Sequence, residues 1–269
     1  MRELPWKTAL ITGASSGLGR GLALWLARRG VQVFAAARRE PELRALAEAC
    51  ATLAGRVHPL RLDVSDGDRT RAEIARIDGA CGGLGLVIAN AGVGFDTPAT
   101  RINWEEVRTI IEVNVSGAAA TLCAAIPGMV QRGRGQLVGI SSLAGFRGLP
   151  RSAAYSASKA FLRVFLEGLR VDLAGSGVRV TSIYPGFVKS EMTAKNRKKL
   201  PFLLETDDAV ERMGSAIARG DAELAFPWQT ASVIRAARLL PTAVWTAVAA
   251  RVGSANRVRS SEADPDRSS

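Results

Sequence analysis

The chain has 269 residues, of which 47% are hydrophobic, so it is long enough to bury the core of a large single domain. Its 36 lysines and arginines exceed its 25 aspartates and glutamates, and the net charge of +11 permits attraction to lipid headgroups or nucleic acids. A single histidine, His58, and three widely spaced cysteines argue against a histidine-based mechanism, a metal cluster and a disulfide framework.

The first predicted element is a short buried strand over residues 7–11, which runs into a glycine-rich turn at 12–19. A helix follows and ends at Gly30. Glycines between a strand and a helix let main-chain N–H groups and the positive end of the helix dipole approach a pyrophosphate. A plain tight turn is the alternative, and the flanking strand and helix favour a phosphate-binding loop. The residues expected to contact a cofactor that carries this pyrophosphate are Thr12, Gly13, Ser15, Ser16, Gly17, Leu18 and Gly19.

The second predicted strand, residues 31–37, ends in three alanines followed by Arg38 and Arg39. In dinucleotide-binding folds an acidic residue at this place binds the ribose 2′-hydroxyl, whereas arginine favours a 2′-phosphate. Alanine stands where the acid would be. We therefore predict that NADP(H) is preferred over NAD(H), although both arginines could simply be solvated charges at a helix start.

Short apolar strands continue to alternate with amphipathic helical stretches along the rest of the chain. The further predicted strands are 57–62, 86–89, 136–140 and 178–183. This alternation predicts a doubly wound α/β domain, with about seven parallel strands and helices on both faces of the sheet. Ligands bind such sheets beyond the carboxyl ends of the strands, where Gly13, Asn90, Ser142 and Pro185 lie.

Tyr155 and Lys159 are four residues apart in a predicted helix, shortly after the serine pair Ser141 and Ser142. Positions i and i+4 share a helix face, so the phenol and the ammonium can reach one pocket. A fixed cation favours the phenolate and is expected to lower the pKa of the tyrosine. This pair predicts acid/base chemistry; the structural alternative is a half-buried aromatic ring beside a solvated amine.

Other short motifs follow the predicted strands and helices. They are Asp63-Val64, Asn90-Ala91-Gly92, Asn114, Ser142 and Pro185-Gly186. Together with the glycine segment and the tyrosine–lysine pair, they stand in the order of the short-chain dehydrogenase/reductase family, which the chain resembles over nearly its whole length. The resemblance implies a single-domain Rossmann-type fold, with residues 1–228 forming the dinucleotide-binding catalytic domain.

The resemblance also implies a role for each matching residue. Tyr155 would be the proton donor or acceptor, Lys159 would hold the nicotinamide ribose, Ser142 would bind the reacting carbonyl, and Asn114 would hold a water linked to the lysine. The other implied cofactor contacts are Asp63 and Val64 at the adenine, Asn90, Ala91 and Gly92 in the cleft, and Pro185, Gly186, Val188 and Ser190 beyond the sixth strand.

Hydride transfer to a carbonyl needs hydrogen-bond donors at the oxygen, a proton source and a cofactor, because no side chain supplies a hydride. The spacing of Tyr155 and Lys159 matches carbonyl/alcohol enzymes of the family. We therefore expect an NADP(H)-dependent oxidoreductase that reduces a carbonyl to an alcohol, or the reverse. The mixed apolar and basic substrate loop 189–206 suits a lipophilic substrate. The alternative is a non-catalytic NADP(H)-sensing or scaffold protein on the same fold.

An amphipathic extension over residues 229–252, interrupted by Pro241, could pack on the domain, join subunits or lie on an anionic membrane surface through residues 231–252. Packing is favoured, because a core-facing helix needs the same apolar stripe. Residues 253–269 are expected to form a disordered tail.

No nucleic-acid-binding motif is found, and a homo-oligomer is expected. The first residues lack the apolar run of a signal peptide and no apolar segment of about 20 residues is found, so we expect a cytoplasmic protein, peripheral at a membrane if the extension binds lipid.

Overall fold

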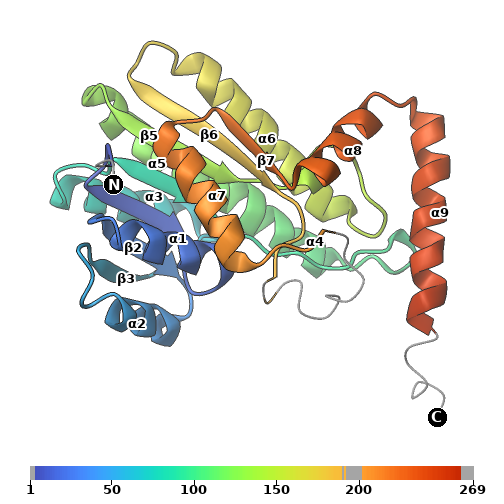
Figure 1. Ribbon diagram of the computed structural model, residues 1–269, viewed down its shortest axis with the longest axis horizontal. Helices are drawn as coiled ribbons and strands as arrows, with labels where there is room; N and C mark the ends of the chain where they lie inside the picture. Colours follow the sequence, from blue (N-terminus) through green and yellow to red (C-terminus); the bar gives the residue numbers. More distant parts are fainter. Residues whose placement is uncertain (1–3, 190, 192–201, 262–269) are drawn as a thin grey trace.

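The computed structural model describes residues 4–189, 191 and 202–261, and shows a seven-stranded, all-parallel sheet in the order β3-β2-β1-β4-β5-β6-β7 (Figure 1). The strands are β1 Thr8–Thr12, β2 Gln32–Ala37, β3 Val57–Arg61, β4 Leu86–Ala89, β5 Gly135–Ile140, β6 Val178–Pro185 and β7 Glu223–Phe226. The helices are α1 Gly17–Ala27, α2 Glu40–Ala49, α3 Gly67–Ala80, α4 Trp104–Ile110, α5 Ala118–Gln131, α6 Ala153–Asp172, α7 Thr206–Arg219, α8 Trp228–Arg238 and α9 Thr242–Ser261. The doubly wound α/β fold predicted from the sequence is confirmed.

Two hydrophobic cores lie on opposite faces of the sheet. One is built around α1, α2 and α7 and contains Leu22, Leu46 and Met213, all fully buried. The other is built around α3, α5 and α6 and contains Leu122 and Leu166. The short strands are buried on both faces, which explains why they are continuous apolar runs rather than alternating ones.

The order of the strands reverses between β1 and β4, which pair in parallel at the middle of the sheet. The chain from β1 continues outward through β2 to β3, and the chain from β4 continues in the opposite direction to β7. Connections on the two sides of this point leave in opposite directions, so a crevice opens at the carboxyl ends of the strands. The glycine turn after β1 and the Asn90 segment after β4 both lie there.

Helices α4 and α5 are joined without a break by a π-helical turn, η2, over Ile111–Gly117. The resulting helix, Trp104–Gln131, has a mean hydropathy of 1.5 over its most apolar part. By length and composition alone, this helix could cross a membrane. The expectation that the chain holds no such segment is therefore wrong. Because this helix packs against α3, β4, β5 and α6, its apolar character belongs to the core of the domain.

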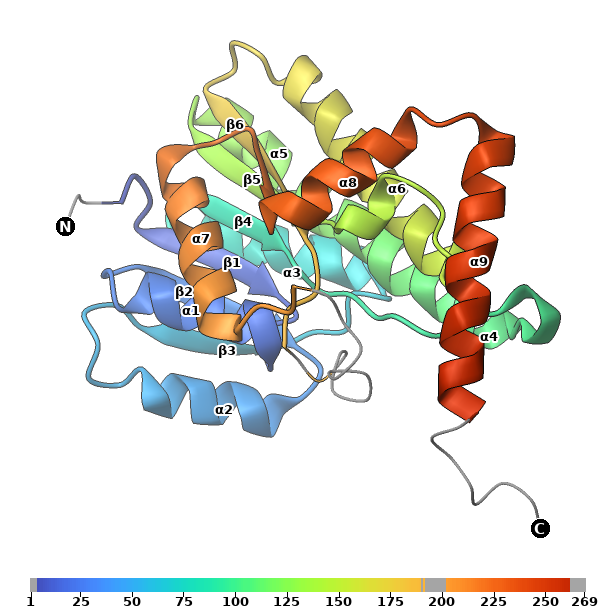
Figure 2. The ribbon, with the colours of Figure 1, turned by 45° about the vertical axis from the view of Figure 1, so that its right-hand side comes forward.

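The C-terminal helices α8 and α9 lie at one end of the molecule, where α8 packs on β7 and α9 extends away from the sheet (Figures 1 and 2). Pro241, after the end of α8 at Arg238, separates the two helices, as its missing N–H and fixed φ require. Helix α9 continues to Ser261, so the tail predicted to be disordered from residue 253 is helical up to that point. Once nucleated, a helix extends at little cost through residues such as Arg257. Residues 262–269 lie outside the described part of the chain.

Candidate active site

The carboxyl ends of β1 and β4 are tied together at the crevice. The side-chain nitrogen of Asn90 donates to the carbonyl oxygens of Thr12 at 2.9 Å and Gly13 at 3.2 Å. In return, the Thr12 hydroxyl accepts from the backbone N–H groups of Asn90 at 3.1 Å and Ala91 at 3.2 Å. A Cβ on Gly13 would lie 2.7 Å from the Cα of Ala91, and one on Gly19 would lie 2.5 Å from the side-chain nitrogen of Asn90. Only glycine fits at both positions.

The N-terminus of α1 faces the crevice after Ser16, and its first turn carries no acidic side chain and no side-chain cap. Gly13 and Gly17 have positive φ angles of 70° and 53°, which the tight turn between strand and helix requires. Backbone N–H groups in the first turn of a helix lack intrahelical partners, and the helix dipole is positive there. The turn therefore has the chemistry to bind the pyrophosphate of a dinucleotide.

A cavity of about 320 Å³ opens beyond the end of β2, and its walls are Arg38, Arg61, Asp63 and Arg69. Three guanidinium groups and one carboxylate fit an adenosine that carries a phosphate. Asp63 itself accepts two hydrogen bonds from Ser65, through its N–H at 3.1 Å and its hydroxyl at 2.8 Å. Arg61 and Arg69 were not predicted from the sequence; their positions at the end of β3 and in the first turn of α3 were the available signal.

Arg39 differs from Arg38, because it does not line this cavity. Its guanidinium donates to the hydroxyl of Ser15, at 3.1 and 3.2 Å, and to the carboxylate of Glu191 at 3.2 Å. Arg39 thus connects the phosphate-binding turn with the segment that follows β6. Of the two arginines predicted to contact the cofactor, the structure places only Arg38 in the cavity.

The predicted catalytic pair lies on α6, and Ser142 lies in the loop that follows the strand β5. Lys159 is 5% exposed, and its ammonium donates to the carbonyl oxygen of Ile140 at 2.9 Å and lies 5.8 Å from the centroid of the Tyr155 ring. The Ser142 hydroxyl accepts from the N–H of Ala144 at 3.1 Å and also hydrogen-bonds the Tyr155 phenol. The phenol, the amine and the hydroxyl therefore converge on one place.

Burial displaces the pKa values of this pair in opposite directions. The pKa of Tyr155 is raised, mainly because burial disfavours the phenolate, and the hydrogen bond with Ser142 lowers it to a smaller extent. Burial also lowers the pKa of Lys159 from its ordinary 10.5 to about 8. We expected the Lys159 ammonium to lower the pKa of Tyr155, but in the free protein the pKa is raised. The cost of burying the phenolate is the larger effect, and the ammonium donates to the carbonyl oxygen of Ile140 instead of to the phenol.

Asn114 lies in the π-helical turn η2 and is 1% exposed. Its side-chain nitrogen donates to the carbonyl oxygen of Val93 at 2.9 Å and to the hydroxyl of Ser158 at 3.0 Å, and its oxygen accepts from the N–H of Val93 at 2.8 Å. A Cβ on Gly92 would lie 3.4 Å both from this oxygen and from the Lys159 nitrogen. Asn114 therefore joins the loop after β4 to the catalytic helix α6, next to Lys159. π-Helical turns are frequent at functional sites.

The segment after β6 packs against the residues that precede α7 and α8. A Cβ on Gly186 would lie 3.0 Å from the ring of Pro227, and Val188 bridges to Leu204. Of the predicted substrate loop 189–206, Lys189 is tied by its N–H to the carbonyl oxygen of Leu204 at 3.0 Å. Ser190 and residues 192–201 lie outside the described residues. The remaining predicted contacts, Val64 and Pro185, lie at the same edge of the sheet, one after β3 and the other at the end of β6.

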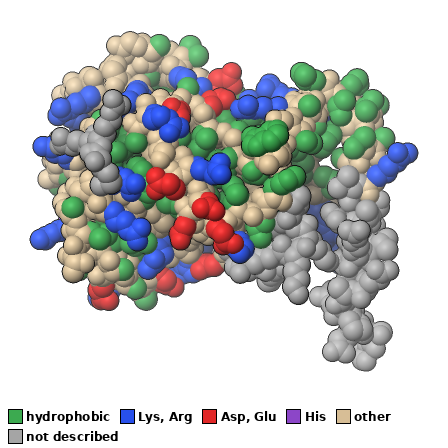
Figure 3. Space-filling model, in the orientation of Figure 1, with side chains coloured by type: hydrophobic (Ala, Val, Ile, Leu, Met, Phe, Trp, Pro, Cys, Tyr) green, Lys and Arg blue, Asp and Glu red, His purple; other side chains and the backbone are tan. Residues whose placement is uncertain are grey.

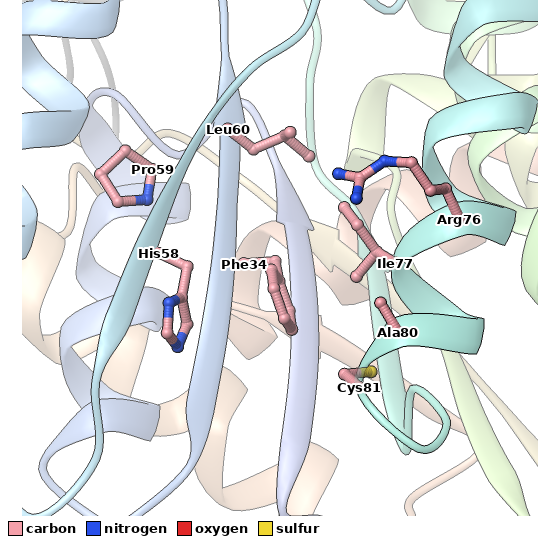
Figure 4. A pocket seen from close by; sticks show the side chains of 8 residues that line it. All are labelled: Phe34, His58, Pro59, Leu60, Arg76, Ile77, Ala80 and Cys81. Atoms are coloured by element: carbon pink, nitrogen blue, oxygen red, sulfur yellow. The ribbon is translucent and has the colours of Figure 1, made fainter.

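A second cavity, of about 340 Å³, lies between the outer strands and α3, away from the catalytic residues (Figure 4). Its walls are Phe34, His58, Pro59, Leu60, Arg76, Ile77, Ala80 and Cys81. His58 stacks on Phe34 with a centroid distance of 5.0 Å and hydrogen-bonds Gln32 at 3.0 Å. The single histidine of the chain therefore has structural partners and does not reach the active site.

Comparisons with known proteins agree with this geometry. The sequence profile of the family described as short chain dehydrogenase matches residues 7–201. An uncharacterized oxidoreductase from Myxococcus xanthus is 62% identical over 252 residues, which is 94% of this chain and all of that protein. A short-chain dehydrogenase from Sphingobium yanoikuyae in complex with NADPH superposes with a TM-score of 0.76, at 26% identity over 97% of this chain and 96% of that one. A short-chain dehydrogenase/reductase from Burkholderia phymatum in complex with NAD gives 0.77, at 25% identity over 87% and 94% of the two chains.

Proposed function

Since this chain belongs to the short-chain dehydrogenase/reductase family of NAD(P)-binding oxidoreductases, we propose that it reduces a lipophilic carbonyl compound to an alcohol with NADPH, or catalyses the reverse reaction. The observation that carries the proposal is the convergence of Tyr155, Ser142 and Lys159 beside the crevice of the sheet. A proton donor, a second hydrogen-bond donor and a buried cation meet where negative charge develops on a reduced carbonyl oxygen.

In the proposed mechanism the bound nicotinamide supplies the hydride. The Ser142 hydroxyl and the Tyr155 phenol donate hydrogen bonds to the carbonyl oxygen, and Tyr155 transfers its proton to that oxygen as charge develops. Its raised pKa keeps the phenol protonated at neutral pH, which is the form that reduction needs. Lys159 keeps a positive charge next to the phenolate that forms, and Asn114 positions α6 through Ser158.

The preference for NADP(H) over NAD(H) is part of the proposal. Arg38, Arg61 and Arg69 supply three guanidinium groups around one cavity at the end of β2, against one carboxylate, and guanidinium groups bind phosphate well. Solved relatives bind either cofactor, so membership of the family leaves the choice open. The local charge of this cavity therefore carries the argument.

The lipophilic substrate is inferred from side chains on segments next to the cofactor-contacting motifs. Phe95 follows the Asn90 segment, Phe187 follows Gly186, and Phe202 lies in the substrate loop; all three rings are partly or largely exposed. Exposed aromatic rings on segments beside the cofactor-contacting motifs suit an apolar ligand.

We further propose that the protein acts in the cytoplasm as a homo-oligomer. Its three cysteines are free thiols, as expected in a reducing compartment. Ile111, Phe161 and Val164 are exposed apolar side chains on η2 and α6, which pack together. A second copy of the chain would cover this patch.

Tyr155→Phe tests the catalytic role, because it keeps the ring but removes the transferable proton. We expect kcat/KM for carbonyl reduction to fall by about 10²- to 10⁴-fold, which is the usual contribution of a general acid, with NADPH affinity retained. NADPH oxidation with a panel of lipophilic ketones and aldehydes measures the first, and fluorescence titration measures the second. Near-normal turnover would contradict the mechanism. Tight NADPH binding without turnover of any carbonyl by the wild-type protein would favour the sensing alternative.

Arg38→Ala tests the cofactor preference, and Arg39→Ala is its matched control from the adjacent position. A lost charge-assisted contact to phosphate should weaken NADPH binding by about 10- to 100-fold and leave NADH binding nearly unchanged. Arg39→Ala should change the ratio of the two affinities far less, because that side chain points to Ser15 and Glu191. Equal losses of NADPH and NADH affinity in Arg38→Ala would refute the assignment.

A further inference from the structure

Helices α8 and α9 form a surface that is both apolar and basic, which we call the basic arm (residues 228–251). Several of its large apolar side chains are of types usually found in a protein core, yet they are exposed to solvent. Leu239 is 85% exposed, Trp228 72% and Val233 67%. On α9, Val244 and Val248 are also exposed on one face of the helix. Hydrophobic and basic side chains share this end of the molecule (Figure 3).

The charge of the arm has one sign only. From residue 224 to residue 251 the sequence contains three arginines and no aspartate or glutamate. Arg238 and Arg251 are exposed, and Arg235 reaches back to Glu223 on β7 at 3.8 Å. The arm thus has no acidic side chain of its own, whereas α2 carries both Arg44 and the Glu40 that pairs with it.

We propose that the basic arm docks on the surface of an anionic lipid bilayer. Exposed apolar side chains lose contact with water when they enter the headgroup region, and arginines are attracted to anionic headgroups; the arm presents both. A second copy of this chain fits less well, because a symmetric contact would bring two arms of the same charge together. A nucleic acid would neutralise the arginines but would leave the apolar side chains in water.

The arm is attached to the loop that leaves the active site. The Arg147 guanidinium donates to the carbonyl oxygens of Arg238 and Leu240, both at 3.1 Å, between α8 and α9. From α9, the Trp245 indole N–H donates to the carbonyl oxygen of Gly148 at 3.1 Å. Arg147 and Gly148 lie between Ser142 and the catalytic helix α6. A bilayer under the arm would therefore lie near the entrance for a lipophilic substrate, and this last step rests on the proposed function.

Flotation of the full-length protein with lipid vesicles tests the docking without any turnover. We expect binding to vesicles of phosphatidylcholine mixed with phosphatidylglycerol, weak binding to phosphatidylcholine alone, and release at high salt. Val233→Glu should weaken binding to the mixed vesicles by about tenfold or more, since it removes an inserted apolar group and adds a repelled charge. The matched control is Val171→Glu, the same change at a valine that is 72% exposed near the far end of α6.

Three results would overturn the proposal: no binding to anionic vesicles, equal binding to neutral ones, or equal weakening by Val233→Glu and Val171→Glu. A lipid-free dimer that Val233→Glu disrupts and Val171→Glu preserves would assign the surface to a second copy instead, and salt-sensitive binding of duplex DNA stronger than vesicle binding would assign it to nucleic acid. Turnover of a water-soluble carbonyl should be the same in both variants. A failure of docking is therefore distinguishable from a failure of the proposed function.

Discussion

Burial sets the protonation states of the catalytic side chains. The pKa of Tyr155 is raised and that of Lys159 is lowered to about 8, both because their charged forms lose solvation. At pH 7 the site consequently holds a protonated phenol and an ammonium group. This is the state from which a proton can be given to a reduced carbonyl oxygen, so the free protein is prepared for reduction.

The pH dependence of the two reaction directions should therefore differ. We expect kcat/KM for carbonyl reduction to be constant near pH 7 and to fall above about pH 8, as Lys159 loses its proton and later Tyr155 does. Oxidation of the alcohol needs the phenolate and should accelerate over the same range. Initial rates in both directions, with a substrate that does not titrate, provide the measurement. A reductive kcat/KM that rises between about pH 7 and 9 would contradict this assignment.

Lys159 should also make the free protein less stable below its folded-state pKa. A group that binds a proton more weakly when folded makes stability rise with pH between the folded value, about 8, and the unfolded value, 10.5. The full difference corresponds to about 3 kcal/mol. We expect the free energy of unfolding of the wild-type protein, compared with Lys159→Met, to increase by about 1–3 kcal/mol across this window. Urea denaturation at several pH values measures it, and parallel curves for the two proteins would refute it.

At the level of single residues, the spacing of the motifs identified the types of side chain that meet at the site. A glycine turn together with a tyrosine and a lysine four residues apart is rarely found outside enzymes of this kind. The spacing could not show which of Arg38 and Arg39 lines the cavity. The direction of each side chain depends on its partners in the folded chain, and Arg39 turns to Ser15 and Glu191. Arg61 was also missed, because its place at the end of β3 was its only signal, and that place alone does not indicate phosphate binding.

The loop after β5 and the helix α6 must pack closely for Ser142 to face Tyr155. Gly145 makes this contact possible: a Cβ at this position would lie 2.7 Å from the backbone carbon and oxygen of Lys159. The hydroxyl of Ser141 donates to the same Lys159 oxygen at 2.8 Å. The relation between the serine and the tyrosine–lysine pair therefore depends on the backbone of one helical turn.

Gly145→Ala should push this loop away from α6, with little direct effect on the cofactor-binding end of the sheet. We expect a loss of about 1–3 kcal/mol in stability and a fall in kcat/KM of at least about tenfold, because small displacements of reacting groups are costly. Gly148→Ala, three residues further on, is the matched control, since a Cβ there meets nothing within 4 Å. Thermal unfolding and initial rates compare the two variants. Equal behaviour of both would show that the close approach at Gly145 has no role.

At the level of elements, six strands were located because buried parallel strands are short apolar runs between turn residues. Strand β7, Glu223–Phe226, was not located, because a four-residue edge strand with a charged first residue has no such run. The π-helical turn around Asn114 was also beyond reach. It arises from the fit of one side chain to Val93 and Ser158, which are distant in the sequence.

For the whole molecule, the alternation of strands and helices was enough to predict the layered fold, because short crossovers leave few topologies for a parallel sheet. The placement of the C-terminal helices was not predictable in the same way. Their apolar stripe suggested packing on the domain, yet only Ala231 and Ala237 of α8 are buried, and larger side chains remain exposed. Attachment of α9 instead depends on polar contacts to residues 147 and 148, which no hydrophobic pattern reveals.

Arg147 should therefore control the position of α9 without supporting the sheet. Arg147→Ala removes two hydrogen bonds to the α8–α9 connection and the contact of the guanidinium with the Trp245 ring, whose centroid is 5.5 Å away. We expect amide hydrogen exchange in residues 242–251 to accelerate by at least about tenfold, while exchange in β1, β4 and β5 stays unchanged, because local openings need not involve the core. Arg134→Ala, at an exposed arginine before β5, is the control. If the strands lost protection together with α9, the arm would be part of the cooperative core rather than an attached element.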